Sequence, residues 1–189
     1  NLTGSVSVHH DGCRLCYTDG IGQLNFTLFC QAGRHDIFCN VTGSIDRKTA
    51  HSGSKILHPV VHLHVFNSRG ELYLQKRPNW KDIQPGKWDT ATGGHVSYGE
   101  GIAEGLKREV EEEIGITDFV PEPLGRYVFE SKVEKELINV FRTTYDGDIR
   151  PNAQELDTGR FWSRNEIIQN IGKGVFTPNF ENEYREFFI

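Results

Sequence analysis

The stretch from Gly93 to Ile116 constrains the fold of this chain more than any other part of its sequence. Apolar residues recur in it every four positions, at Ile102, Leu106, Val110 and Ile114. This spacing predicts a helix over 102–114 with one apolar face packed on another layer of the protein. Gly115 follows at once and is suited to end the helix as its C-terminal cap.

The same helix carries an unusual density of carboxylates. Glu109, Glu112 and Glu113 are spaced i, i+3 and i+4, which places them on one face, while Glu111 points away. Such a face is either a solvated acidic surface or a site for a hard divalent cation, because Mg²⁺ and Mn²⁺ prefer oxygen ligands and would remove the repulsion. Gly93 and Gly94 would let the backbone approach such a ligand closely.

The segments around this helix alternate apolar and polar residues or repeat with a helical period. We expect strands over 60–67, 71–77, 88–95, 124–131 and 135–145 and one starting at 160, and helices over 165–171 and 179–188. Strands before, between and after helices predict a layered α/β or α+β domain.

Length and charge narrow the class of protein. The 189 residues suggest one domain over 37–189, preceded by a cysteine-containing extension of uncertain structure over 1–36. A net charge of -5 argues against a nucleic-acid polymer as partner but is compatible with a small phosphorylated substrate held by a few local cations. With no apolar run of about 20 residues and no secretory signal, we expect a cytoplasmic protein without membrane contact; a homodimer stays open.

All four cysteines lie near the start of the chain, at Cys13, Cys16, Cys30 and Cys39. The Cys13 and Cys16 spacing is typical of half a zinc site, but the later two are too far apart in sequence for the usual second half. Zinc bound by these four thiols, two disulfides and four reduced thiols all remain open.

The fixed positions of the helix region, taken together, resemble the Nudix box with every position filled: Gly94, Glu100, Arg108, Glu109, Val110, Glu112, Glu113, Gly115 and Ile116. The resemblance implies the Nudix α/β/α sandwich with a mixed central sheet, and Mg²⁺ or Mn²⁺ on a substrate diphosphate. It implies metal-binding roles for Glu109, Glu112 and Glu113, with the Gly94 carbonyl as a further ligand. Glu100 and Arg108 would then be mainly structural and hold the loop to the helix.

In a hydrolase of this kind the metal activates a water molecule and a carboxylate takes its proton. The candidate bases are Glu109 within the helix and Glu155 or Glu136 outside it; the sequence does not choose among them. Glu112 belongs to the same catalytic set.

The chain also resembles type I isopentenyl diphosphate isomerase, a Nudix-fold enzyme, through NVTGSIDRKTAH, HPVVHLHVFNSRGELYLQKR, PGKWDTATGGH and EKELINVFR. The resemblance implies a metal set of His51, His58, His95, Glu134 and Glu136. It also implies that Arg47, Arg77 and Lys81, with Arg108 of the box, lie in the region that contacts the substrate diphosphate. His62 and His64 alternate on the first predicted strand and could simply line the sheet.

One departure separates the chain from the isomerases. Gly93 stands where they have a catalytic cysteine, and no cysteine follows Cys39. We therefore expect a divalent-metal-dependent hydrolase that cleaves a diphosphate linkage in a nucleoside-diphosphate-linked or other organic diphosphate. The alternatives are an isomerase-like enzyme and a non-catalytic ligand-binding Nudix domain.

Overall fold

The computed structural model describes residues 28–32, 37–41, 44–81, 83–97 and 99–189, the first two ranges as backbone strands only. Nine strands of this described part form one sheet. They are β1 (Leu28–Ala32), β2 (Ile37–Val41), β3 (Leu57–Phe66), β4 (Leu72–Lys76), β5 (Trp88–Asp89), β6 (Thr92–His95), β7 (Glu122–Glu130), β8 (Lys135–Thr144) and β9 (Thr158–Trp162).

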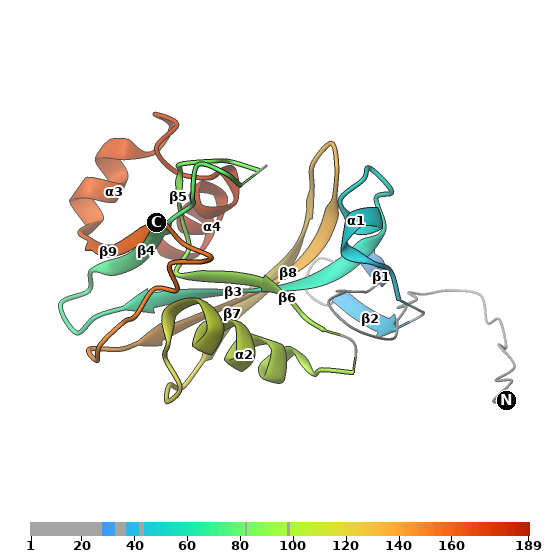
Figure 1. Cartoon of the computed structure of the whole chain (residues 1–189), viewed down its shortest axis with the longest axis horizontal. Helices are drawn as coiled ribbons and strands as arrows, with labels where there is room; N and C mark the ends of the chain where they lie inside the picture. The colour runs from blue at the N-terminus through green and yellow to red at the C-terminus, as the bar shows by residue number, and fades with distance from the viewer. Residues whose placement is uncertain (1–27, 33–36, 42–43, 82, 98) are drawn as a thin grey trace, which may run out of the picture.

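Helices lie on both sides of this sheet. They are α1 (Arg47–Ala50), α2 (Ile102–Ile114), α3 (Arg164–Asn170) and α4 (Pro178–Phe188). Figure 1 shows α2 along one face of the sheet and α3 and α4 on the other, with α1 beside β1. The predicted α/β/α sandwich with a mixed central sheet is confirmed.

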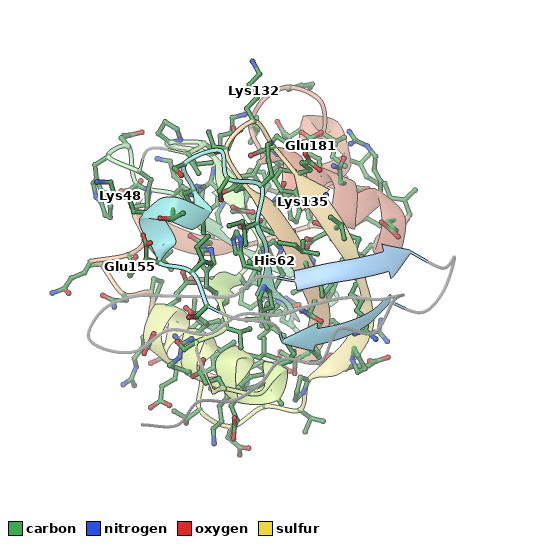
Figure 2. All side chains as sticks on the ribbon, turned by 90° about the vertical axis from the view of Figure 1, so that its right-hand side faces the viewer. Lys48, His62, Lys132, Lys135, Glu155 and Glu181 are labelled. Carbon is green, nitrogen blue, oxygen red and sulfur yellow. The ribbon has the colours of Figure 1, made fainter. Side chains whose placement is uncertain are left out.

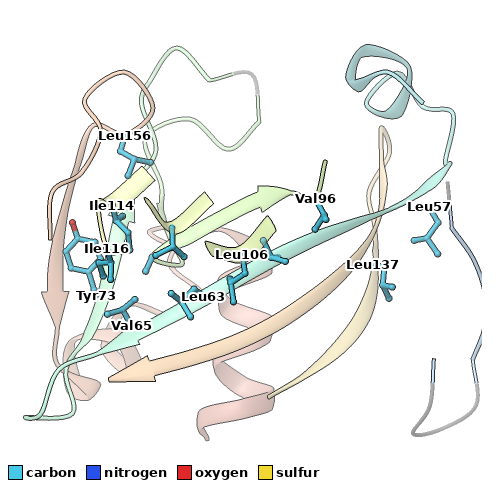
Figure 3. Packing of buried hydrophobic residues seen from close by; sticks show 13 residues of the cluster. Leu57, Leu63, Val65, Tyr73, Val96, Leu106, Ile114, Ile116, Leu137 and Leu156 are labelled. Atoms are coloured by element: carbon cyan, nitrogen blue, oxygen red, sulfur yellow. The ribbon is translucent and has the colours of Figure 1, made fainter. Parts of the chain in front are cut away.

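The long strand β3 organises the sheet. It runs parallel to β8 and antiparallel to β1, β4 and β6, so the sheet is mixed. Val61, Leu63 and Val65 are fully buried on the side of β3 that faces α2, as Figure 3 shows for Leu63 and Val65. The intervening residues, including His62 and His64, face α4, because successive side chains of a strand point to opposite faces.

Helix α2 has the bounds predicted from its periodicity. Leu106, Val110 and Ile114 are buried in the core between α2 and β3. Gly115 ends the helix in the left-handed region, with a φ of 70°, and its N–H donates to the Glu111 carbonyl. A residue with a side chain would be strained in this conformation.

Strand β3 begins three residues before the predicted start at Val60. Pro59 has no N–H to donate to a ladder, yet its carbonyl accepts a hydrogen bond of 3.2 Å from the Val96 N–H. The strand can therefore run through the proline.

The hairpin of β1 and β2 spans the predicted boundary between residues 36 and 37, and Leu28 pairs with Leu57 of β3. Cys30 and Cys39 stand opposite each other in the hairpin register, while Cys13 and Cys16 lie outside the described residues. The state of the four cysteines, zinc included, stays a prediction. None of the described helices is long and apolar enough to cross a bilayer.

Candidate active site

The first part of the site is the contact between α2 and the glycine pair of β6. Glu109 packs directly over Gly94, where a Cβ would overlap the Glu109 carboxyl group. The Gly93 N–H donates a 3.1 Å hydrogen bond to Glu113 Oε2. Two carboxylates of one helix face are thus pressed against a backbone that carries no side chains.

The pKa values of these two carboxylates are raised by their partial burial. Burial, followed by the charge of Glu109, raises the pKa of Glu113 to about 8. Burial also raises the pKa of Glu109, although Arg108 offsets part of the effect. Two partly buried carboxylates at such close range repel each other when both are ionised, and a divalent cation would supply the counter-charge that favours their ionised forms.

Arg108 holds the loop before α2 to the helix. Its Nε donates to Glu100 Oε1 at 2.7 Å and its Nη1 to Glu109 Oε1 at 2.8 Å and Glu112 Oε2 at 3.1 Å. Its Nη2 donates to the His95 carbonyl at 2.9 Å. Every nitrogen of the guanidinium is engaged by the protein, an arrangement that fits a structural role, and the contact of Arg108 with substrate stays a prediction.

The three predicted metal-binding glutamates are unequally exposed. The side chain of Glu112 is 58% exposed and that of Glu109 12%. Glu111 is exposed, as predicted from its place on the helix. Glu112 is therefore the carboxylate of this face that is most open to solvent and to an incoming ligand.

Two of the predicted substrate-binding cations lie in ion pairs near the loop after β4. Lys81 Nζ is 2.7 Å from Glu155 Oε2 and 5.0 Å from the centre of the Trp80 ring, which is 65% exposed. Arg77 Nη1 is 3.4 Å from Asp89 Oδ2. The charges of Lys81 and Glu155 both act on the pKa of Glu113, so this ion pair lies close to the α2 carboxylates.

The second part of the site is a histidine cluster. A nitrogen atom from each of His51, His58 and His95 lies within 4.8 Å of the others. His51 Nδ1 is 2.6 Å from Glu134 Oε2, and His58 Nδ1 donates to the Ile56 carbonyl at 3.0 Å. Both contacts leave Nε2 free as a ligand atom, and a hydrogen bond behind a histidine is the usual support of a metal ligand.

His58 Nε2 is buried and has no hydrogen-bond partner among the described residues. Glu136 Oε1 lies 3.8 Å from it and 3.8 Å from His95 Nε2. Burial, followed by His58 and His51, lowers the pKa of His95 well below its ordinary value, which keeps this ring neutral. The neutral ring of His95, the unpartnered buried nitrogen of His58 and the nearby Glu136 carboxylate together fit a metal ion.

Glu134 and Glu136 differ within this cluster. Glu136 approaches the ligand nitrogens of two histidines, whereas Glu134 contacts the opposite nitrogen of His51. Burial would raise the pKa of Glu134, but the hydrogen bond and charge of His51 outweigh it and lower the pKa. The geometry suits Glu136 as a ligand and Glu134 as the group that orients His51. Arg47 at the start of α1 acts on the pKa of His95 and so lies near the cluster.

Strand β6 joins the two parts of the site. Its consecutive residues Gly93, Gly94 and His95 contact Glu113, Glu109 and the histidine cluster in turn. His95 Nε2 is 3.1 Å from the Nε2 of His51. The carboxylates and the histidines therefore belong to one continuous region around β6.

The sequence did not reveal a third group of polar residues on the α4 side of the sheet. Glu183 of α4 is fully buried, and its Oε1 accepts hydrogen bonds from His62 Nδ1 at 2.7 Å and Tyr127 Oη at 2.6 Å. Its Oε2 accepts from His64 Nε2 at 2.8 Å. One signal was available: Glu183 lies in the apolar stripe of the last helix, between Phe180 and Phe187, where a carboxylate needs a buried partner.

Gly94→Ala is expected to lower the free energy of unfolding by about 1–3 kcal/mol, because the new methyl group must displace the Glu109 carboxyl. Urea unfolding measures the change. Gly101→Ser is the matched control, since position 101 has room for a side chain and serine favours the start of a helix. Equal stability of both variants and the wild type would contradict the close packing at Gly94.

Glu113 makes the stability of the metal-free protein depend on pH. Its pKa is about 8 in the folded chain against an ordinary 4.5, so the folded state binds more protons between these values. The contribution of Glu113 to the free energy of unfolding therefore falls as pH rises, by about 1.4 kcal/mol per pH unit.

Urea unfolding in EDTA at pH 5, 5.75 and 6.5 isolates this effect as the difference between the wild type and Glu113→Gln. The wild type should lose stability relative to the variant as pH rises. The subtraction is needed because His95, whose pKa is lowered, changes stability in the opposite direction over the same range. A pH-independent difference would contradict the raised pKa of Glu113.

Comparison with known proteins agrees with this architecture. The NUDIX domain family matches residues 56–180. An uncharacterized Nudix hydrolase of Pseudomonas aeruginosa is 41% identical over 97 residues, covering 51% of this chain and 57% of that protein. Isopentenyl-diphosphate Delta-isomerase 1 of Photorhabdus laumondii is 30% identical over 156 residues, covering 78% of this chain and 88% of that protein.

Solved structures show the same fold. A protein of Deinococcus radiodurans superposes with a TM-score of 0.67 at 22% identity, covering 79% of this chain and 93% of that one. A MutT protein of Methanosarcina mazei superposes with a TM-score of 0.60 at 28% identity, covering 69% and 92%. The family match covers about two thirds of the chain, and the chain therefore belongs to the Nudix family.

Proposed function

We propose that the chain hydrolyses the diphosphate bond of a small organic diphosphate, with Mg²⁺ or Mn²⁺ held by Glu109, Glu112 and Glu113 and the Gly94 carbonyl. The observation that carries this proposal is the pair of partly buried carboxylates, Glu109 and Glu113, packed against the glycines of β6 with raised pKa values. Such an arrangement is unfavourable for the metal-free fold, because burial and mutual repulsion disfavour the ionised carboxylates, and a bound cation would remove that cost.

When bound, the metal neutralises diphosphate charge and lowers the pKa of a bound water. The chain's own residues orient the metal-binding carboxylates and contact the substrate. Arg108 fixes Glu109 Oε1, so that Glu109 keeps one orientation. Lys81, at 24% side-chain exposure beside Glu155, lies close enough to the carboxylates to meet an anionic substrate.

Two carboxylates are the best candidates for the general base that accepts a proton from the attacking water. The raised pKa of Glu109 brings it closer to the range in which a general base works at neutral pH. Glu155 is half-exposed and held at one oxygen by Lys81, which leaves its other oxygen for a water molecule. Glu136, the third candidate, lies in the histidine cluster and fits a metal ligand better.

The histidine cluster supports a second metal ion, held by His51, His58 and His95 with Glu136 as a further ligand and Glu134 behind His51. Three imidazoles favour Zn²⁺ or Mn²⁺ over Mg²⁺. Titration calorimetry of the EDTA-treated protein with Mn²⁺ should find tight binding that His58→Ala weakens at least tenfold. The matched control is His64→Gln, which removes a buried histidine outside the cluster; equal loss in both variants would contradict the assignment.

A second candidate function is isomerisation of a prenyl diphosphate. It is favoured by the Photorhabdus isomerase relative and by the histidine and glutamate set. It is disfavoured by Gly93, which offers no side chain for proton transfer, and the hydrolase therefore stands first.

The experiment is a panel assay with nucleoside diphosphates, sugar nucleotides and prenyl diphosphates in Mg²⁺ or Mn²⁺. Release of orthophosphate or of a nucleoside monophosphate from one class would support the hydrolase and name the organic half of its substrate. Conversion of isopentenyl to dimethylallyl diphosphate would support the isomerase instead. A compound that raises the melting temperature but is never converted would favour the non-catalytic ligand-binding domain.

A further inference from the structure

Glu183 lies at the centre of a buried group of polar residues on the α4 side of the sheet. Its carboxylate is fully buried and engages His62, His64 and Tyr127. A buried ion pair adds little net stability compared with apolar residues of similar volume, because both charges must leave water. The stability of the fold alone therefore does not account for this group.

His62 and His64 bind the same carboxylate but differ in their second ring nitrogen. His64 is 0% exposed, and its Nδ1 lies 3.4 Å from Thr90 Oγ1. His62 uses Nδ1 for Glu183, and its Nε2 has no hydrogen-bond partner among the residues that the structure describes. Its side chain keeps 9% exposure. His64 is enclosed on both sides, whereas His62 presents one free nitrogen.

The free edge of His62 lies over Gly93. A Cβ at position 93 would be 3.2 Å from both Nε2 and Cδ2 of His62, so any larger residue there would press on the ring. Gly93 is paired with His62 across β3 and β6, and His95 follows two residues later on the same face. The position of His62 in the ladder is therefore one two-residue repeat, roughly 7 Å, from that of His95.

The surrounding carboxylates favour the protonated His62 ring, in which Nε2 carries a hydrogen and can donate it. Burial would lower the pKa of His62, but Glu183, Asp89 and Glu136 outweigh it and raise the pKa to about 9. Tyr127 donates to the same Glu183 oxygen as His62 and fixes the position of that oxygen. In Figure 2 the side chain of His62 lies in the middle of the molecule, whereas that of Lys132 lies at the rim.

We propose that His62 is a substrate-binding residue: its Nε2–H, oriented by Glu183 and left uncovered by a side chain at Gly93, donates a hydrogen bond to an anionic oxygen of the diphosphate substrate. The proposal rests on the proposed function for its substrate class. It gives Gly93 a positive role, since a side chain at that position would cover the donor.

The test compares His62→Gln with His64→Gln in the full chain saturated with Mg²⁺, using methylenediphosphonate, a diphosphate analogue that cannot be hydrolysed, as the probe. Loss of a hydrogen bond to a charged group should weaken binding about 10- to 100-fold in His62→Gln and leave His64→Gln near the wild type. In ¹⁵N-histidine NMR spectra of the wild type, the probe should shift the His62 Nε2 resonance and leave that of His64 in place.

Gly93→Ala is the second variant, because it touches the ring edge without removing any member of the Glu183 group. It should weaken binding of the probe in the same direction as His62→Gln. Binding unchanged in both variants, or an unshifted His62 resonance at saturating probe, would overturn the proposal. If no compound of the panel is cleaved but the probe still shifts His62, the hydrolase proposal fails and the His62 proposal stands.

Discussion

Glu113→Gln and Glu109→Gln are each expected to lower the rate of diphosphate hydrolysis by roughly 10²–10⁴-fold at saturating Mg²⁺. Both residues face the glycine pair of β6, and neither amide can supply the negative charge that holds a divalent cation. The measurement is steady-state phosphate release from the compound that the panel identifies, together with the Mg²⁺ concentration that gives half of the maximal rate.

Glu111→Gln is the matched control on the same helix. Glu111 is exposed and points away from the carboxylate face, so its variant should keep wild-type activity within about twofold, as expected for a solvated surface charge. If all three variants behaved alike, the carboxylate face of α2 would have no special role and the proposed function would lose its main support.

Glu183→Ala is expected to lower the free energy of unfolding by about 3–5 kcal/mol, the usual cost of removing one partner of a buried charged pair. Glu183 is fully buried, and the variant would leave His62, His64 and the Tyr127 hydroxyl without their acceptor. Urea unfolding at pH 7 measures the change.

Glu186→Ala on the same helix is the control, because Glu186 is exposed and a surface substitution usually changes stability by less than about 0.5 kcal/mol. A cost below about 1 kcal/mol for Glu183→Ala would mean that water reaches its partners, contrary to the complete burial of the carboxylate.

The helix that carries the box could be predicted closely because local signals agreed with one another. The apolar spacing, the glycine after Ile114 and the layer it packs on all favour the same bounds. The start of β3 could be predicted less closely. Pro59 has no N–H and so indicates a break in the strand, yet its carbonyl accepts a hydrogen bond that continues the ladder.

The histidine cluster could be predicted as a set but not in its internal roles. His51, His58 and His95 come together as the resemblance implied. Which glutamate approaches their ligand nitrogens depends on the parallel register of β3 and β8, where His58 stands opposite Glu136. No local pattern in the sequence fixes that register.

The Glu183 group could not be predicted because it joins residues 121 positions apart in the chain. Alternation places His62 and His64 on one face of their strand, but only the packing of the last helix on that face supplies their partner. A carboxylate within an apolar stripe indicates that it has a buried partner, but the sequence does not identify that partner.

Hydrolysis in ¹⁸O-labelled water, followed by mass spectrometry of the products, separates cleavage of a diphosphate bond from isomerisation. We expect two products from one organic diphosphate, with a single ¹⁸O atom in a phosphate group of one of them, and far less of this labelled product from Glu113→Gln over the same time. A product of unchanged mass and no incorporated ¹⁸O, such as an isomerised prenyl diphosphate, would contradict the hydrolase proposal.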